Sequence, residues 1–214
     1  MKDVLDTELQ LFLRSILPDE DEVQTELRDY ADAHHISVVD PEVGYLLHLL
    51  TGLVKPESVL EIGTAIGCSG IYIARAMEQG SLTTIELTEE RHTMALDYFR
   101  RAGVADKIHA ICGDARDIVP QLDTQYDMIF MDAAKGQYIN FMPDILRLLK
   151  KDGVLVSDNV LQDGDIIESH FVVTRRNRTI HKRMREYLYE LTHREDLVTA
   201  VLPIGDGITL SSKR

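Results

Sequence analysis

The chain has 214 residues, of which 44% are hydrophobic and 28% are charged, so it is long enough to bury one good core as a single domain. No apolar run reaches the length of a membrane span, and the acidic start MKDVLDTE lacks a signal-peptide core, so we expect a cytoplasmic protein with no membrane contact. The formal net charge of −13 disfavours a general nucleic-acid binder, because a phosphate backbone repels an acidic surface.

Three helices are expected before the first strand. Residues 4–17 place apolar side chains near helical spacing. A second helix is expected over residues 19–35, with Asp19 as its N-cap and further acids in its first turn, where they suit the helix dipole. Pro41 fits the first turn of a third helix that runs to about Leu53. Residues 1–54 are therefore expected to form a helical cap on a core of residues 55–214.

From residue 57 onward the pattern changes to an alternation of strands and helices. Buried strands are expected at 58–62, 82–86, 107–112, 126–131 and 154–157. Helices are expected to begin at Ile71 and Asp114 and to span 89–102, 138–149 and roughly 174–194. Two more strands, 197–202 and 207–211, are expected to form an antiparallel hairpin at the sheet edge. This order predicts an α/β fold, a doubly wound, Rossmann-like sheet of seven mostly parallel strands.

Two of the expected strands end in acidic segments, FMDAAKGQY and LVSDNV. Asp132 follows the first strand, and Asp158 and Asn159 follow the second. Three oxygen ligands on two adjacent strand ends make a site suited to Mg²⁺ or a similar divalent cation. Lys135, three residues after Asp132, is placed to move a proton.

The other strand ends carry groups that suit a nucleoside. The first strand runs into GTAIGCSG, a glycine-rich turn that lets the backbone approach a ligand closely. Glu86, at the end of the second strand, is placed to accept hydrogen bonds from two ribose hydroxyls, and Asp114, after the third, from an adenine amino group. Each feature alone is also explained as a packed turn, a helix cap or a solvated loop. Their succession along the chain favours an adenosine-containing cofactor.

Glycine spacing and charge narrow this cofactor further. Gly63, Gly67 and Gly70 give the spacing G-x₃-G-x₂-G, which differs from the G-x-G-x-x-G of dinucleotide-binding enzymes and disfavours a nicotinamide oxidoreductase. Carboxylates attract a sulfonium, whereas they would repel a pyrophosphate. The pattern therefore favours a sulfonium-bearing cofactor over a dinucleotide.

A basic segment, TRRNRTIHKRMR, begins at Thr174 and contains no acidic residue. It is also explained as a solvated helix face. Its cations repel one another unless an anion is nearby, and arginine suits phosphate recognition. The side chains expected to contact phosphates are Arg175, Arg176, Arg178, Lys182 and Arg183.

The motifs form an ordered set: EIGTAIGCS from Glu61, the pair Ile85–Glu86, GDA from Gly113, DAAKGQY from Asp132, and the pair Asp158–Asn159. Together they resemble the cation-dependent, catechol-type O-methyltransferases that use S-adenosylmethionine, over roughly residues 40–214. Within that family, TAIG, DAAKGQY, DNVL and PIGDG are most similar to the bacterial tRNA 5-hydroxyuridine methyltransferases, which make 5-methoxyuridine at the wobble position. The resemblance implies a class I methyltransferase fold and a homodimer.

The resemblance also implies roles for individual residues. Asp132, Asp158 and Asn159 match the metal ligands, and Lys135, with Asp132 beside it, matches the catalytic base. The chain has no tryptophan, so the aromatic wall beside the metal in animal catechol enzymes cannot be built with that residue. The positions that match cofactor contacts are Val43, Glu61, Gly63, Ser69, Glu86, Asp114, Ala115 and Asp132.

The expected reaction is transfer of a methyl group from S-adenosylmethionine to a hydroxyl that lies next to a second oxygen, with Mg²⁺ or another divalent cation bound. The expected acceptor is wobble 5-hydroxyuridine in a tRNA anticodon loop. A small catechol or caffeoyl-CoA-type acceptor presents the same pair of oxygens and is the alternative. A non-catalytic RNA-binding protein on the same fold is a second alternative.

Overall fold

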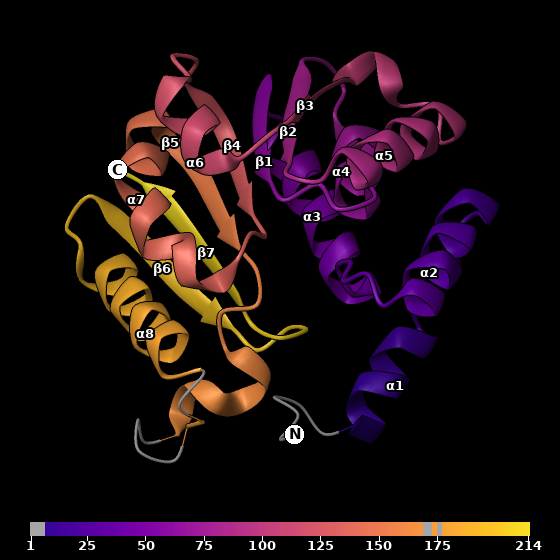
Figure 1. Ribbon diagram of the computed structural model, residues 1–214. Helices are drawn as coiled ribbons and strands as arrows, with labels where there is room; N and C mark the ends of the chain where they lie inside the picture. The colour runs from indigo at the N-terminus through magenta and orange to yellow at the C-terminus, as the bar shows by residue number, and fades with distance from the viewer. Residues whose placement is uncertain (1–6, 169–172, 175–176) are drawn as a thin grey trace.

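Seven strands form one sheet: β1 (Ser58–Ile62), β2 (Ser81–Glu86), β3 (Ile108–Cys112), β4 (Tyr126–Met131), β5 (Leu149–Ser157), β6 (Leu197–Leu202) and β7 (Ile208–Lys213). The structure is a computed structural model that describes residues 7–168, 173–174 and 177–214. The strand order is β3-β2-β1-β4-β5-β7-β6, and β7 is antiparallel to both of its neighbours. The predicted fold class, with its mostly parallel sheet and β6–β7 edge hairpin, is therefore confirmed (Figure 1).

The described helices are α1 (Thr7–Ser15), α2 (Glu22–His34), α3 (Pro41–Val54), α4 (Cys68–Ala76), α5 (Glu89–Arg101), α6 (Ala115–Ile118), α7 (Tyr138–Leu148) and α8 (Arg178–His193). Four short 3₁₀ segments join them: η1 (Ala105–Lys107), η2 (Val119–Gln121), η3 (Lys135–Gln137) and η4 (Gln162–Ile167). None of the helices in the described ranges is both long and apolar enough to cross a bilayer.

Alternation along the strands builds two hydrophobic cores, one on each face of the sheet. On β4, Met128 and Phe130 pack with α3, α4 and α5, whereas Ile129 and Met131 pack with α7 and α8. Successive side chains of a strand point to opposite faces, so a fully apolar strand such as β4 needs cover on both. Figure 1 shows these two groups of helices on opposite sides of the sheet.

Two helix starts differ from the sequence prediction. The N-cap of α2 is Asp21, whose carboxylate accepts a 2.9 Å hydrogen bond from the Gln24 amide, and not Asp19. α4 begins at Cys68 rather than Ile71, directly after Gly67 in a left-handed conformation. The apolar pattern starts only at Ile71, so the sequence predicts that the small and polar residues of the first turn of α4 belong to the glycine-rich turn.

The register of the parallel strands aligns their carboxyl ends. Ile62 lies opposite both Ile85 and Met131, and Met131 lies opposite Ser157. The residues that directly follow these strands therefore share one edge of the sheet, where open α/β sheets bind ligands.

At this edge the backbones of β1 and β4 approach each other closely. Gly63 has φ +105°, and a Cβ atom added to it would lie 1.9 Å from the Asp132 carbonyl oxygen. Glycine is the residue that accepts both this backbone conformation and this contact. The first residue after β1 is thereby held against the first residue after β4.

We expect Gly63→Ala to lower the free energy of unfolding by more than about 2 kcal/mol, because it adds a steric clash to the strain of a positive φ. Gly103→Ala is the matched control, since Gly103 also has a positive φ but no atom within 4 Å of the added Cβ. It should cost only about 1 kcal/mol of backbone strain. Denaturant unfolding measures both variants, and equal losses would contradict the proposed contact.

Candidate active site

Two adjoining cavities lie at the carboxyl edge of the sheet. The first, about 480 Å³, is bounded by the ends of β1, β2 and β3 and by η3. The second, about 370 Å³, is bounded by residues 37–40, by the ends of β4 and β5 and by the loop before β7. Ser37, Asp132, Lys135 and Asn159 line both, so the two cavities meet at these side chains. After the roles expected from the sequence, we call the first the cofactor cavity and the second the acceptor cavity.

Glu86 stands in the wall of the cofactor cavity, where it was expected from the sequence. Its carboxylate accepts hydrogen bonds from the backbone amides of Ala65, at 2.8 Å, and Thr88, at 2.9 Å. The side chain is only 6% exposed. These two amides fix the carboxylate beside the glycine-rich turn while part of its surface faces the cavity.

Gly113, Asp114 and Ala115 line the same cavity from the end of β3. The Asp114 carboxylate caps α6 by accepting from the Arg116 amide at 2.8 Å, and it also binds the Arg116 guanidinium at 2.6 Å. Hydrogen bonds from Arg116 hold the pKa of Asp114 below its ordinary value. Asp114 is therefore a charged hydrogen-bond acceptor at the cavity mouth, and Arg116 already uses part of its accepting capacity.

Glu61 and Ser69 lie beneath the glycine-rich turn and do not line the cofactor cavity. Glu61 is fully buried, and one of its carboxylate oxygens accepts hydrogen bonds from Thr84 and Ser69. Alternation along β1 explains this position, because Ile62 faces the cofactor cavity and its neighbour Glu61 faces the opposite side under α4. Burial raises the pKa of Glu61 to about 7.

This burial makes stability depend on pH. The ordinary glutamate pKa is 4.5 and the folded value is about 7, so the unfolded chain loses this proton first and stability falls as pH rises between them. Glu61→Gln should therefore show a smaller decline in unfolding free energy from about pH 5 to about pH 7.5 than the parent. Glu78→Gln, which removes an exposed charge, is the control. A decline equal to that of the parent would contradict the assignment.

Asp132, Asp158 and Asn159 come together in the acceptor cavity. Asp158 is 2% exposed, and its carboxylate accepts a 2.6 Å hydrogen bond from the backbone amide of Asn159. Asn159 has φ +59°, a left-handed conformation that asparagine tolerates better than most residues. This turn aims its side chain into the same cavity as the two carboxylates.

Both carboxyl groups resist ionisation. Burial, followed by the charge of Asp158, raises the pKa of Asp132; burial also raises the pKa of Asp158, with Asp40 and Asp206 adding to the effect. A divalent cation relieves such repulsion, and two carboxylates with one amide oxygen suit a hard cation. No cluster of three or more His, Cys, Asp or Glu side chains fit to hold a metal occurs in the described residues, so Asn159 completes the candidate ligand set.

Mg²⁺ is therefore expected to raise the thermal unfolding midpoint more at about pH 8 than at about pH 6, because protons compete with the cation for Asp132 and Asp158. Asp158→Ala should remove most of this increase. Asp144→Ala, which alters a carboxylate on α7 paired with Arg147, is the control. An increase of the same size in Asp158→Ala would rule out this ligand set.

Lys135 reaches the acceptor cavity from η3, and its ammonium group forms a 2.7 Å ion pair with Asp206. The sequence analysis assigned no role to Asp206, because it treated residues 203–206 as the connection of an edge hairpin. In the structure, β7 pairs with β5, so the loop that precedes β7 lies beside Asp158 and Asn159. Leu161 fixes this loop by donating its backbone N–H to the Asp206 carbonyl at 2.9 Å.

Val43, expected to touch the cofactor, lies in the wall of the acceptor cavity. It belongs to the first turn of α3 and is 1% exposed. Its contact with the cofactor stays a prediction.

The basic segment before and within α8 does not present all its cations to solvent. Arg183 donates to the Gly136 carbonyl at 3.0 Å, and Arg178 donates to the Val173 carbonyl at 3.2 Å. Lys182 is exposed and pairs with Glu186 at 3.6 Å. Arg175 and Arg176 lie outside the described residues. Arg183 thus ties α8 to η3, which carries Lys135, a structural role the sequence analysis did not foresee.

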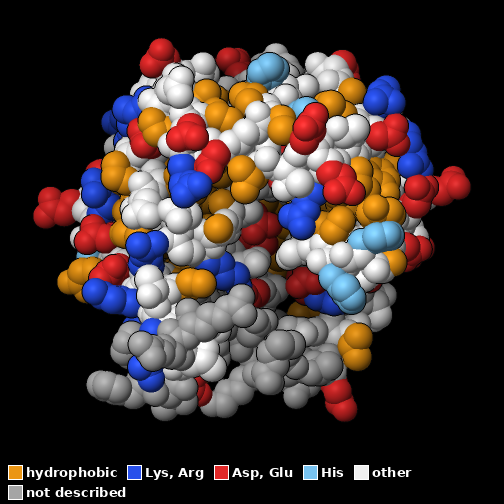
Figure 2. All heavy atoms as spheres, viewed as in Figure 1, with side chains coloured by type: hydrophobic (Ala, Val, Ile, Leu, Met, Phe, Trp, Pro, Cys, Tyr) orange, Lys and Arg blue, Asp and Glu red, His pale blue; other side chains and the backbone are white. Residues whose placement is uncertain are grey.

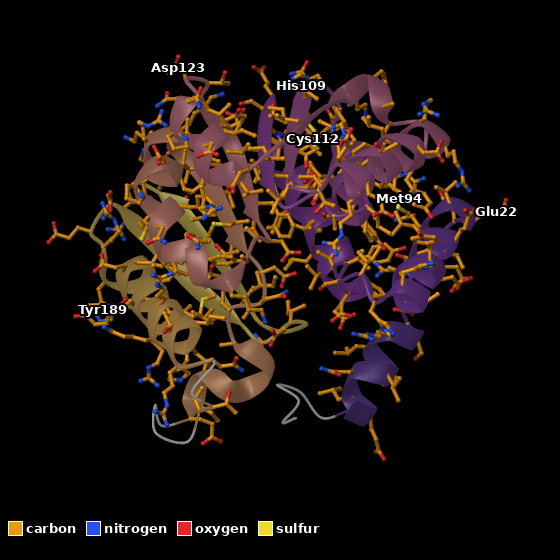
Figure 3. All side chains as sticks on the ribbon, viewed as in Figure 1. Glu22, Met94, His109, Cys112, Asp123 and Tyr189 are labelled. Atoms are coloured by element: carbon orange, nitrogen blue, oxygen red, sulfur yellow. The ribbon has the colours of Figure 1, made fainter. Side chains whose placement is uncertain are left out.

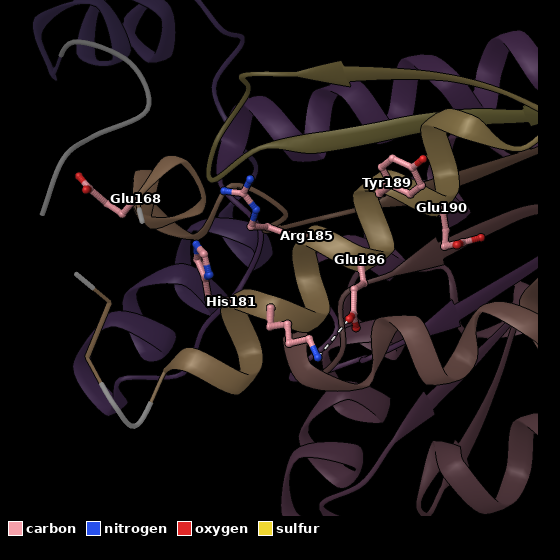
Figure 4. A pocket seen from close by; sticks show the side chains of 7 residues that line it. Glu168, His181, Arg185, Glu186, Tyr189 and Glu190 are labelled. Carbon is pink, nitrogen blue, oxygen red and sulfur yellow. Dashed lines mark ion pairs between the residues drawn. The ribbon is translucent and has the colours of Figure 1, made fainter. Parts of the chain in front are cut away.

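A third cavity, about 580 Å³, lies on the outer side of α8 and touches none of the strand ends. Its lining contains the cations Lys182 and Arg185 and the acids Glu186 and Glu190, and Figure 4 shows Arg185, Glu186 and Glu190 along α8. Tyr189 points away from the molecule (Figure 3), and cations and anions are interspersed over the face seen in Figure 2. This mixed charge does not single out an anionic ligand, so we place the candidate active site at the strand ends.

This chain is similar to known proteins over most of its length. The sequence model of the O-methyltransferase family matches residues 15–214. Caffeoyl-CoA O-methyltransferase 1 of Eucalyptus globulus is 30% identical over 208 residues, which cover 92% of this chain and 83% of that protein. The catechol O-methyltransferase of Niastella koreensis is 36% identical over 137 residues, 62% of each chain.

Solved structures show the same fold. The O-methyltransferase TomG of Streptomyces achromogenes, involved in tomaymycin synthesis and solved with S-adenosylmethionine, superposes with a TM-score of 0.86 at 28% identity, over 100% of this chain and 99% of that one. The O-methyltransferase of Bacillus cereus gives 0.86 at 23% identity over 97% and 98% of the two chains. On the family match and these relatives, the chain belongs to the O-methyltransferase family.

Proposed function

We propose that this chain transfers a methyl group from S-adenosylmethionine to a hydroxyl group that has a second oxygen on the adjacent carbon, with a divalent cation bound. The observation that carries this proposal is the meeting of the two cavities at Asp132, Lys135 and Asn159. A methyl donor in one cavity and an acceptor in the other would face each other there. In the transfer, the sulfur–methyl bond breaks, the oxygen–methyl bond forms, and the hydroxyl proton leaves.

In the cofactor cavity, Glu86 would accept hydrogen bonds from the ribose and Asp114 from the adenine amino group. Two features support this orientation. Glu86 is fixed by two backbone amides next to the turn, and Asp114 stands at the opposite wall after β3. Asp132 and Glu86 line this cavity, and their carboxylates would attract a sulfonium rather than repel it.

In the acceptor cavity, Asp132, Asp158 and Asn159 would hold the cation. When bound, a divalent cation lowers the pKa of an acceptor hydroxyl and orients it. Lys135, in the wall of both cavities, would receive the hydroxyl proton as a neutral amine, the form that a bound cation favours by repelling the ammonium. Asp206 at 2.7 Å would stabilise the ammonium that this transfer forms. Positioning of the two substrates and this proton transfer are the parts of catalysis that the chain itself supplies.

A small dihydroxy aromatic compound is the acceptor class that the relatives favour. Several proteins similar over most of this chain are caffeoyl-CoA O-methyltransferases, and a further relative is a catechol O-methyltransferase. Two adjacent hydroxyl groups on a ring give the paired oxygens that the candidate ligand set requires.

Wobble 5-hydroxyuridine in tRNA is a second candidate acceptor, because its hydroxyl and neighbouring carbonyl form the same pair of oxygens. The exposed Lys182 on α8, together with the cation-rich sequence before it, supports this candidate. The engagement of Arg183 with Gly136 reduces the number of cations free to contact phosphates.

Incubation with S-adenosylmethionine and Mg²⁺, and with either catechol or tRNA that contains 5-hydroxyuridine, separates the two candidates. If tRNA is the acceptor, Lys182→Glu should lower kcat/KM for tRNA by about three- to tenfold, because it reverses a charge near the phosphates. Lys55→Glu, which reverses an exposed charge on the far end of α3, is the matched control and should leave it unchanged. Product mass spectrometry gives the readout.

Methylation of catechol alone would exclude tRNA as the acceptor. Turnover of neither acceptor, or turnover that survives Asp158→Ala, would contradict the proposed function. Binding of tRNA without turnover by the parent or Asp158→Ala protein would instead support a non-catalytic RNA-binding role.

A further inference from the structure

The segment between α2 and α3, residues 36–40, forms one wall of the acceptor cavity; we call it the strap. Ser37, Val38, Val39 and Asp40 all line that cavity, and Ser37 also lines the cofactor cavity. The strap has no helical or strand structure. Its position relative to the strand ends must therefore come from contacts made by other parts of the chain.

Within the part of the chain that the structure describes, backbone hydrogen bonds fix the strap at its two ends. The Ile36 amide donates to the Ala31 carbonyl at 2.9 Å, and the Asp40 carbonyl accepts from the first turn of α3. Between these ends, the hydrogen bond recorded among the described residues comes from Arg28 of α2, whose Nη1 donates to the Val39 carbonyl at 2.6 Å. Val39 is followed by Asp40, whose negative charge acts on the Asp158 carboxylate.

Arg28 is itself held firmly. Its Nε donates to both carboxylate oxygens of Glu20, at 2.8 and 2.7 Å, and the two side chains are 17% and 13% exposed. A lysine could not reproduce these contacts, because only the planar guanidinium presents several donors in fixed directions. Glu20 thus orients Arg28, and Arg28 orients the strap.

Tyr72 connects this cluster to the cofactor side of the site. Its hydroxyl donates to Glu20, and its ring packs on α3 at Gly44, where an added Cβ would lie 2.3 Å from the ring. Tyr72 lies on α4, the helix that follows the glycine-rich turn. The cluster therefore touches α2, the strap and the helix that leaves the cofactor cavity.

We propose that Arg28 is a positioning residue, which holds the strap through the Val39 carbonyl and thereby sets where the acceptor lies relative to the methyl donor. The expected effect on turnover rests on the proposed function, whereas the attachment of the strap by Arg28 does not depend on that function. Arg28 itself lines neither cavity, so it acts through the strap.

Arg28→Lys tests the proposal, because it keeps the charge but loses the hydrogen bond to Val39. We expect kcat/KM for the acceptor to fall about tenfold and KM for S-adenosylmethionine to change less than about twofold. Backbone deuterium exchange of residues 37–40 should become faster. The acceptor is catechol or 5-hydroxyuridine tRNA, according to which the parent methylates.

Two further variants separate positioning from general stability. Glu26→Ala removes an exposed ion pair between α2 and Arg101 of α5 and should leave exchange of the strap and turnover unchanged. Tyr72→Phe removes the hydroxyl, which also interacts with Arg28, but keeps the hydrogen bonds of Arg28 to Glu20 and to the Val39 carbonyl, so its kcat/KM for the acceptor should stay close to the parent value. Should Arg28→Lys fail to fold, Glu20→Gln is expected to change both readouts in the same direction with smaller amplitude.

Unchanged exchange of residues 37–40 in the folded variant would overturn the proposal. So would faster exchange with the acceptor kcat/KM of the parent, or an equal loss in Tyr72→Phe. If the parent methylates neither acceptor, the proposed function fails, and deuterium exchange alone decides whether Arg28 holds the strap.

Discussion

The contact between Gly63 and the Asp132 carbonyl is the constraint on which the site depends. It brings the end of β1 against the end of β4, and so brings the glycine-rich turn against the first candidate metal ligand. Any side chain at position 63 would separate them by at least the width of a methyl group. Because no side chain at position 63 fits between the two strand ends, these ends lie close together and Asp132 lines both cavities.

Electrostatics gives this narrow junction its chemical character. Burial raises the pKa values of Asp132 and Asp158, the charge of Asp158 adds to the effect on Asp132, and those of Asp40 and Asp206 add to the effect on Asp158. Lys135, which lines the same cavity, is already paired with Asp206. A folded protein keeps such an arrangement at a cost in stability, which is typical of functional sites. Glu61 differs from Asp132 and Asp158, because the hydrogen bonds that it accepts from Thr84 and Ser69 lie inside the protein and support α4.

Much of this arrangement could be predicted from the sequence because parallel strands end at one edge. Polar residues after successive apolar runs, such as Glu86, Asp132 and Asp158, therefore indicate a common site without knowledge of the strand order. The residues that were missed depend on other information. Asp206 reaches the site only because β7 inserts between β5 and β6, and Arg28 acts through a carbonyl of a segment without periodicity. A motif match does not state which face of a strand a residue occupies, so the burial of Glu61 was not foreseen, and its contact with the cofactor stays a prediction.

The antiparallel direction of β7 has a consequence for synthesis. β1 to β5 present the residues that follow them to the site, whereas β7 presents the residues that precede it. β7 pairs with β5 only after α8 and β6 have been made, so Asp206 joins Lys135 later than every other site residue described here. On the ribosome, all residues that line the cofactor cavity, from Ser37 to Asn159, are thus made while the acceptor cavity is still open on one side. A nascent chain in that interval has the proposed place for the methyl donor before it has a closed place for the proposed acceptor.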